Sequence, residues 1–207
     1  MRKLHIVLLL AVVGVFQFSC QKEVSIDSIT GGGTANNDLI GTWKFLYLHA
    51  KTNQSVEATD GVDKEKIISV SEYFTKNNGG TLSFDATKMT GTGFAYSIDT
   101  IVKGYFYLND ILIDSVEVPF FASIPPSNSV GNYKLIGTDS LYFESGGLVD
   151  IGGSGGQQTI PGGAKFKIEN GVLTLTQYYH GVQTETDQGV VTTTTNDAFL
   201  ESFFQKQ

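Results

Sequence analysis

Short runs in which hydrophobic and polar residues alternate follow one another along the chain from residue 38 onward. From residue 81 to residue 86, Leu82, Phe84 and Ala86 alternate with polar side chains. This is the pattern of a β-strand with one solvent-exposed face. Comparable runs predict strands over 42–50, 66–75, 89–98, 101–108, 111–118, 130–136, 140–144 and 189–195, and a hairpin over 164–183. No helical run is long enough for a parallel crossover, so we expect sequential antiparallel strands.

Turn chemistry predicts a hairpin near the C-terminal end of this series. Asn170-Gly171 favours a two-residue type I′ turn, which places Phe166 opposite Leu175 on one face of the hairpin. The turn and the hydrophobic alternation therefore select the same register independently.

A second hairpin is predicted around residues 109 and 110. This turn places Phe106 opposite Ile113 and puts Tyr105, Tyr107 and Leu112 on the other face. Both faces are then apolar, so either another element covers the tyrosine face or that face is an exposed binding patch.

The last residues predict a short helix. Asn196 is a helix-capping residue type, and Phe199/Phe203 and Leu200/Phe204 are each spaced one helical turn apart. We expect this helix to pack on the outside of the sheet.

A sequential meander of strands leaves two unpaired edges unless it closes on itself. The predicted fold class is therefore all-β, an antiparallel up-and-down β-barrel of about 8–10 strands with a short C-terminal helix. The alternative is a β-sandwich of two packed sheets.

Composition and charge argue against some classes of binding partner. The chain has 207 residues, of which 41% are hydrophobic and 12% aromatic, so it can form a single β domain with a sizeable core. If Arg2 and Lys3 are lost with a leader, 12 basic and 21 acidic residues remain, a net charge of −9. This excess of acid argues against nucleic acid and against electrostatic attraction to anionic lipid.

The N-terminus has the layout of a secretory signal. Arg2 and Lys3 precede an apolar run that is too short to span a bilayer, and Ser19 stands immediately before Cys20. A leader over 1–19 that ends on the only cysteine resembles a bacterial lipoprotein signal, which implies that Cys20 carries acyl chains, palmitate among them, as a membrane anchor. The alternative is an ordinary secreted protein with a free thiol.

Residues 20–37 have no hydrophobic period and contain three consecutive glycines, which predicts a flexible tether ahead of a domain over 38–207. Lys22 and Glu23 resemble the short tag that sends lipoproteins of the Bacteroidota to the outer face of the outer membrane. We therefore expect an outer-membrane protein that faces the cell surface. The glycine-rich stretch 146–163 is expected to be either disordered or a flap over a barrel mouth.

The start of the predicted domain carries a further resemblance. Gly41 and Trp43 open the first strand, and simple alternation places Phe45, Tyr47 and His49 on the same face as Trp43. This Gly-x-Trp resembles the signature of lipocalins, and the whole chain looks like the lipocalin-like lipoproteins of Bacteroidota. The resemblance implies that the indole plugs the closed end of a barrel. Phe45, Tyr47 and His49 would then line a cavity for a small apolar or amphipathic ligand.

Motifs of catalysis and metal binding are not evident in the sequence. No spacing of His, Cys or carboxylates matches a metal site, no nucleophile elbow appears, and the only thiol is assigned to the lipid. We therefore expect a monomeric, non-enzymatic binding protein without cofactor or metal.

Two further functions use the outside of the barrel. Tyr105 and Tyr107 are typical of a surface interaction or inhibitor protein, and Tyr178-Tyr179 of a glycan-binding module with a shallow groove.

Overall fold

The computed structural model describes residues 38–143 and 162–207. The predicted leader and tether, with Cys20, and residues 146–161 of the glycine-rich stretch lie outside the described residues.

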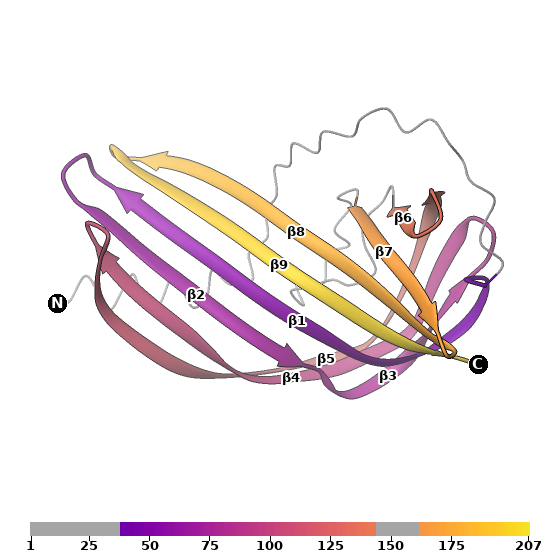
Figure 1. Cartoon of the computed structure of the whole chain (residues 1–207). Helices are drawn as coiled ribbons and strands as arrows, with labels where there is room; N and C mark the ends of the chain where they lie inside the picture. Colours follow the sequence, from indigo (N-terminus) through magenta and orange to yellow (C-terminus); the bar gives the residue numbers. More distant parts are fainter. Residues whose placement is uncertain (1–37, 144–161) are drawn as a thin grey trace.

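The described residues form one antiparallel sheet of nine strands (Figure 1). The strands are β1 (Gly41–Thr59), β2 (Lys64–Phe74), β3 (Lys76–Phe84), β4 (Lys88–Leu108), β5 (Ile111–Ile136), β6 (Ser140–Phe143), β7 (Gly162–Glu169), β8 (Val172–Asp187) and β9 (Val190–Lys206). The last strand pairs with the first, so the sheet closes in a barrel-like ring rather than forming two packed layers.

The ring is complete at one end of the molecule only. The short strands β6 and β7 fill the space between β5 and β8, but they pair only with residues 133–136 of β5 and 172–176 of β8. Within the described residues, 111–132 of β5 pair with β4 alone, and 177–187 of β8 pair with β9 alone. Figure 1 shows the result, in which the long strands extend well beyond β6 and β7. We call these two halves the closed end and the open end.

Strands β2 and β3 follow one another along the same side of the ring. Residues 41–44 of β1 pair with β3, and residues 49–59 pair with β2. At the break between the two strands, the Leu48 amide donates to the Thr75 hydroxyl at 2.9 Å, and the Thr75 amide donates to the Leu48 carbonyl at 2.9 Å. These two bonds satisfy the backbone of β1 where its partner changes.

The closed end is filled by large apolar side chains. Trp43 is fully buried, as its size predicts, and its indole nitrogen donates to the Leu39 carbonyl at 2.9 Å. The Lys206 ammonium lies 4.8 Å from the centre of the indole ring. The other large side chains that are less than 2% exposed include Phe143, Phe204, Leu48, Leu82, Leu141, Leu173, Leu175 and Leu200.

The predicted C-terminal helix is wrong, because residues 190–206 form the strand β9. Leu200 and Phe204 are buried in the core, whereas Phe199 and Phe203 lie on the opposite face, so the period is two rather than that of a helix. Asn196 does not cap a helix but accepts a hydrogen bond from the Gln54 amide at 2.8 Å. Residues 190–195 are rich in β-branched Val and Thr, which favour a strand.

The hairpin between β7 and β8 is confirmed. Phe166 pairs with Leu175, and both Asn170 and Gly171 have positive φ, as a type I′ turn requires.

The hairpin between β4 and β5 also turns at residues 109 and 110, but its predicted register holds only next to the turn. A β-bulge between Phe106 and Tyr107 places Phe106 opposite Asp114 instead of Ile113.

In the part of the chain that the structure describes, no helix is long and apolar enough to cross a bilayer.

Candidate functional site

A β-bulge in the first strand decides which side chains face outward. The pairing of β1 with β9 shifts between Phe45 and Tyr47, so the alternation reverses at this point. Phe45 is buried in the core. The side chains of Tyr47 and His49 project from the opposite face, because their neighbours Leu48 and Ala50 now point inward. Phe45 therefore shares the inner face with Trp43, as predicted, but the prediction that Tyr47 and His49 lie on that face is wrong.

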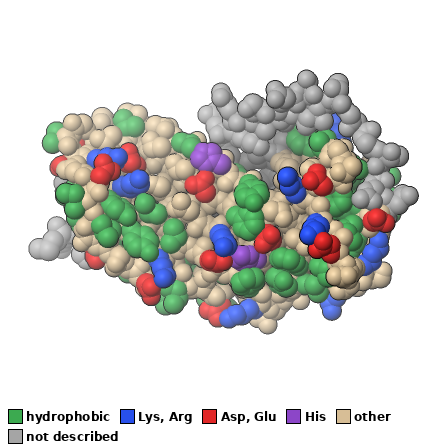
Figure 2. Space-filling view, in the orientation of Figure 1, with side chains coloured by type: hydrophobic (Ala, Val, Ile, Leu, Met, Phe, Trp, Pro, Cys, Tyr) green, Lys and Arg blue, Asp and Glu red, His purple; other side chains and the backbone are tan. Residues whose placement is uncertain are grey.

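The outer face carries a group of aromatic rings that the bulge brings together. His49 stacks on Phe74 with ring centres 4.3 Å apart and an angle of 7° between the planes. Tyr47 stacks on Phe203 at 4.5 Å, and Phe199 lies 6.3 Å from His49. Figure 2 shows histidine, acidic and hydrophobic side chains together on the face that is turned toward the reader.

Two carboxylates hold the imidazole of His49 in place. Its Nε2 lies 2.9 Å from Glu72 Oε1, and its Nδ1 lies 3.4 Å from Glu201 Oε2. The Lys51 ammonium approaches the same Glu72 oxygen at 3.0 Å. The hydrogen bond with His49, and then the one with Lys51, lowers the pKa of the Glu72 carboxyl below its usual value. Glu72 is therefore an anion at neutral pH.

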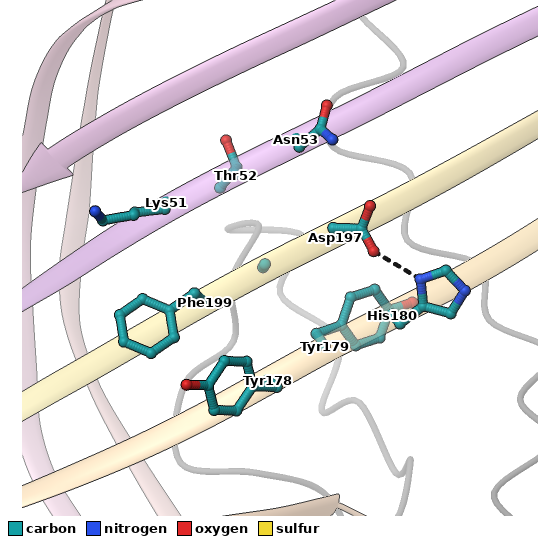
Figure 3. A pocket seen from close by; sticks show the side chains of 9 residues that line it. Lys51, Thr52, Asn53, Tyr178, Tyr179, His180, Asp197 and Phe199 are labelled. Carbon is teal, nitrogen blue, oxygen red and sulfur yellow. Dashed lines mark hydrogen bonds and ion pairs between the residues drawn. The ribbon is translucent and has the colours of Figure 1, made fainter.

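A shallow groove of about 440 Å³ lies beside these rings, over β1, β9 and β8 (Figure 3). Three consecutive residues of each strand line it, namely Lys51, Thr52 and Asn53, then Asp197, Ala198 and Phe199, and finally Tyr178, Tyr179 and His180. The volume falls at the lower end of the range for small-molecule sites, about 300–1,000 Å³.

The register shows that the groove opens on the outer face. Lys51 pairs with Phe199, which pairs with Tyr178. These three side chains project from the same face of the sheet as His49. The middle residues of the three strands alternate to the inner face, and the Tyr179 ring indeed packs over Gly181 on that side. The backbone of the middle residues therefore forms the floor of the groove.

The two walls of the groove differ in chemistry. One wall is aromatic, because Tyr178 and Phe199 lie with ring centres 5.0 Å apart, and Tyr178 is 76% exposed. The other wall is polar, and its His180 Nδ1 lies 2.6 Å from Asp197 Oδ1. Asn53 adds an amide to this polar wall (Figure 3).

Such a groove can hold a flat or saucer-shaped molecule that has one apolar face and a polar edge. Tyr178 and Phe199 offer a surface for apolar contact, and Asp197, Asn53 and His180 offer acceptors and donors along one side. Within 38–143 and 162–207, no three His, Cys, Asp or Glu side chains converge as a metal site would require.

Two of the sequence hypotheses involved tyrosines on the outside, and the structure places them on different strands. Tyr178 lines the groove, but Tyr179 leaves the other face. Tyr105 and Tyr107 lie half-buried on the outer face of β4, which β2 separates from the groove strand β1, and Leu112 beside them is 53% exposed.

Sequence reasoning missed Phe74 because its place beside His49 follows from the pairing of β1 with β2. It missed Phe199 and Phe203 because their spacing also fits a helix. A period of two in 199–204, with Leu200, Ser202 and Phe204 on one side, was the signal that could have found them.

The chain matches no family model, no curated protein and no solved structure.

Proposed function

We propose that this protein is a lipid-anchored cell-surface module that binds carbohydrate on the outer face of its sheet. The observation that carries the proposal is the groove, in which the exposed ring of Tyr178 and the ring of Phe199 face the polar group of Asp197, His180 and Asn53.

Sugars fit the two walls of the groove. A pyranose ring has a face of C–H groups that packs on an aromatic ring and an edge of hydroxyl groups that need hydrogen-bond partners. The carboxylate of Asp197 and the amide of Asn53 supply acceptors and donors at the edge. An exposed tyrosine in contact with a groove gives contact area at a low cost in side-chain entropy.

The role of Tyr178 is tested by replacing it in the full-length protein. Tyr178→Ala should weaken binding to a neutral polysaccharide about tenfold, roughly 1.4 kcal/mol, because it removes most of the aromatic wall. The dissociation constant is measured by affinity electrophoresis in gels that contain the polysaccharide.

The matched control is Phe121→Ala, since Phe121 is 72% exposed on β5, away from the groove. Equal affinity of the Tyr178→Ala and Phe121→Ala variants, with unchanged unfolding midpoints, would contradict the proposed site.

The anchor belongs to the same proposal. A basic start, a short apolar run and Ser19-Cys20 support acylation of Cys20, and Lys22-Glu23 support display on the outer surface of the outer membrane. Metabolic labelling with a palmitate analogue should modify the protein and fail to modify the Cys20→Ser variant.

The lipocalin-like identity of the fold is also a proposal. The ring of antiparallel strands and the buried Trp43 after Gly41 support it. An experimental structure in which β1 and β9 are separated would contradict it.

A small apolar ligand on the inner face is a second candidate function. Side chains fill the closed end, but beyond it the inner faces of β4 and β5 are apolar, with Val102 opposite Val118, and with Phe106 and Val116 both near Gly104. Native mass spectrometry of the purified protein, which would detect a co-purified small molecule, tests this candidate.

A further inference from the structure

The groove is one end of a longer aromatic surface, which we call the aromatic band. Its rings form a continuous series of contacts from Tyr178 to Phe199 at 5.0 Å, from Phe199 to His49 at 6.3 Å, and from His49 to Phe74 at 4.3 Å. Phe74 lies 6.0 Å from Tyr47, which stacks on Phe203. The band therefore crosses the outer face of β8, β9, β1 and β2.

The rings of the band are not needed for the core. Trp43, Phe45 and Phe204 leave the other face of the same strands and fill the closed end. At the two ends of the band, Tyr178 is 76% and Phe74 is 55% exposed. Aromatic side chains that remain exposed and in contact with one another are typical of binding surfaces.

The band is too long for a single sugar ring. Tyr178 stands on β8 and Phe74 on β2, three strand positions away, and neighbouring strands are about 4.8 Å apart, so the two strands are separated by about 14 Å. The half-buried rings of Phe199 and His49 lie between them. A ligand that touches both exposed rings must therefore be an extended chain.

The charges along the band select the class of chain. Glu72 and Glu201 flank His49, and Asp197 lies in the groove, so three carboxylates line the path. The nearest ammonium, Lys51, is already paired with Glu72 at 3.0 Å. Carboxylates accept hydrogen bonds from hydroxyl groups but repel uronate or sulfate groups. The surface fits a neutral chain.

We propose that the aromatic band binds a linear neutral polysaccharide at several consecutive sugar subsites, from Tyr178 in the groove to Phe74 on β2. This inference rests on the proposed function and adds the length and the charge of the ligand. Tyr178 and Phe74 form the two end subsites, and His49, held by its two carboxylates, forms part of the floor between them.

The first test is a panel of soluble polysaccharides with the full-length protein in affinity gels. The neutral members are amylopectin, xylan, galactomannan and mixed-linkage β-glucan, and the anionic members are polygalacturonate and alginate. Binding to a neutral member and at least about tenfold weaker binding to both anionic members supports the proposal. Tighter binding to an anionic member overturns the selection for neutral chains, and no binding to any member overturns the proposed function as well.

The second test uses oligosaccharides of increasing length from the polysaccharide that binds. Affinity should rise about tenfold from the shortest to the longest chain. Phe74→Ala should abolish this gain and leave the affinity for the shortest chain unchanged, whereas Tyr178→Ala should weaken binding at every length.

The control is again Phe121→Ala. Binding affinities are compared only among variants that have the same unfolding midpoint. If short and long chains bind equally, or if Phe74→Ala behaves as the control does, the aromatic band is not the binding surface even though the groove is.

Discussion

Hydrogen bonds with carboxylates hold several single side chains and turns of this sheet in position. His49 is held between Glu72 and Glu201, so its ring stays parallel to the Phe74 ring. Asp85 holds the turn between β3 and β4. Its Oδ1 accepts hydrogen bonds from the backbone amides of Thr87 at 2.8 Å and Lys88 at 2.6 Å. The carboxylates of Glu72 and Asp85 accept these hydrogen bonds most strongly as anions.

The turn at Asp85 should make stability depend on pH. The hydrogen bond from the Thr87 amide, and then the one from Lys88, lowers the pKa of Asp85 below its usual 3.8. A lowered pKa stabilises the folded state above pH 3.8, and this contribution is lost as the pH falls through the folded-state pKa. The Asp85→Asn variant should therefore be less stable than the wild type at neutral pH and approach it in acid.

Urea denaturation at a series of pH values measures this difference. A gap between Asp85→Asn and the wild type that stays constant down to the lowest pH would show that the Asp85 charge does not stabilise the turn.

At the scale of strands, small departures from regular pairing decide what each face displays. The bulge between Phe45 and Tyr47 turns Tyr47 and His49 outward, and the bulge between Phe106 and Tyr107 shifts β5 by one residue against β4. The pairing of β3 with β4 shifts at Gly79, next to Gly80. Each irregularity changes the side on which the following residues lie.

Gly80 should be the glycine least able to carry a side chain. Its φ is +105°, and an added Cβ would lie 2.8 Å from the backbone of Gly93 on the neighbouring strand. Gly80→Ala should therefore destabilise the protein by about 3 kcal/mol, since neither backbone can move without breaking the β3–β4 pairing.

The matched control is Gly131→Ala, because an added Cβ there has nothing within 4 Å. Thermal unfolding should show little change for this control, within about 1 kcal/mol. Equal midpoints for the two variants would contradict the close approach of β3 and β4.

The sequence predicted most of the strands because their alternation and turns agree, as at Phe166 and Leu175 beside Asn170-Gly171. It failed where one pattern fits two structures. Phe199 and Phe203 are one helical turn apart but also lie on one face of a strand, and only pairing with β1 and β8 decides between the two. A bulge leaves no such pattern, so the outward position of His49 was not predictable.

At the scale of the whole molecule, the two ends of the ring differ in how they are stabilised. The closed end has the buried core, with Trp43, Leu173 and Phe204, and the open end is a curved sheet with two edges. The candidate site lies over the middle strands. The sequence indicated only Tyr178-Tyr179 of this site, because the other residues come from strands that are far apart in the chain, as Lys51 and Phe199 are.

Hydrogen exchange should separate the two ends. Amides of 41–50 and 200–206, which lie between paired strands at the closed end, should exchange only through near-global unfolding. Amides of 111–130 and 177–187, each on a strand with a single partner, should exchange much faster. The measurement is exchange mass spectrometry on the full-length protein, and uniform protection along β5 and β8 would contradict the description of an open end.

The contact between Lys206 and the start of the domain has a mechanical consequence. The Lys206 ammonium binds the carbonyl of Asp38 at 2.8 Å, so the point where a membrane tether would attach lies at the closed end, at the foot of β1. A load pulling on a ligand that is held by Asn53 would pass lengthwise down β1, which is bonded to a neighbour on each side. Such a load shears many ladder hydrogen bonds together instead of peeling them apart in turn, and a sheet resists shear far better than peeling.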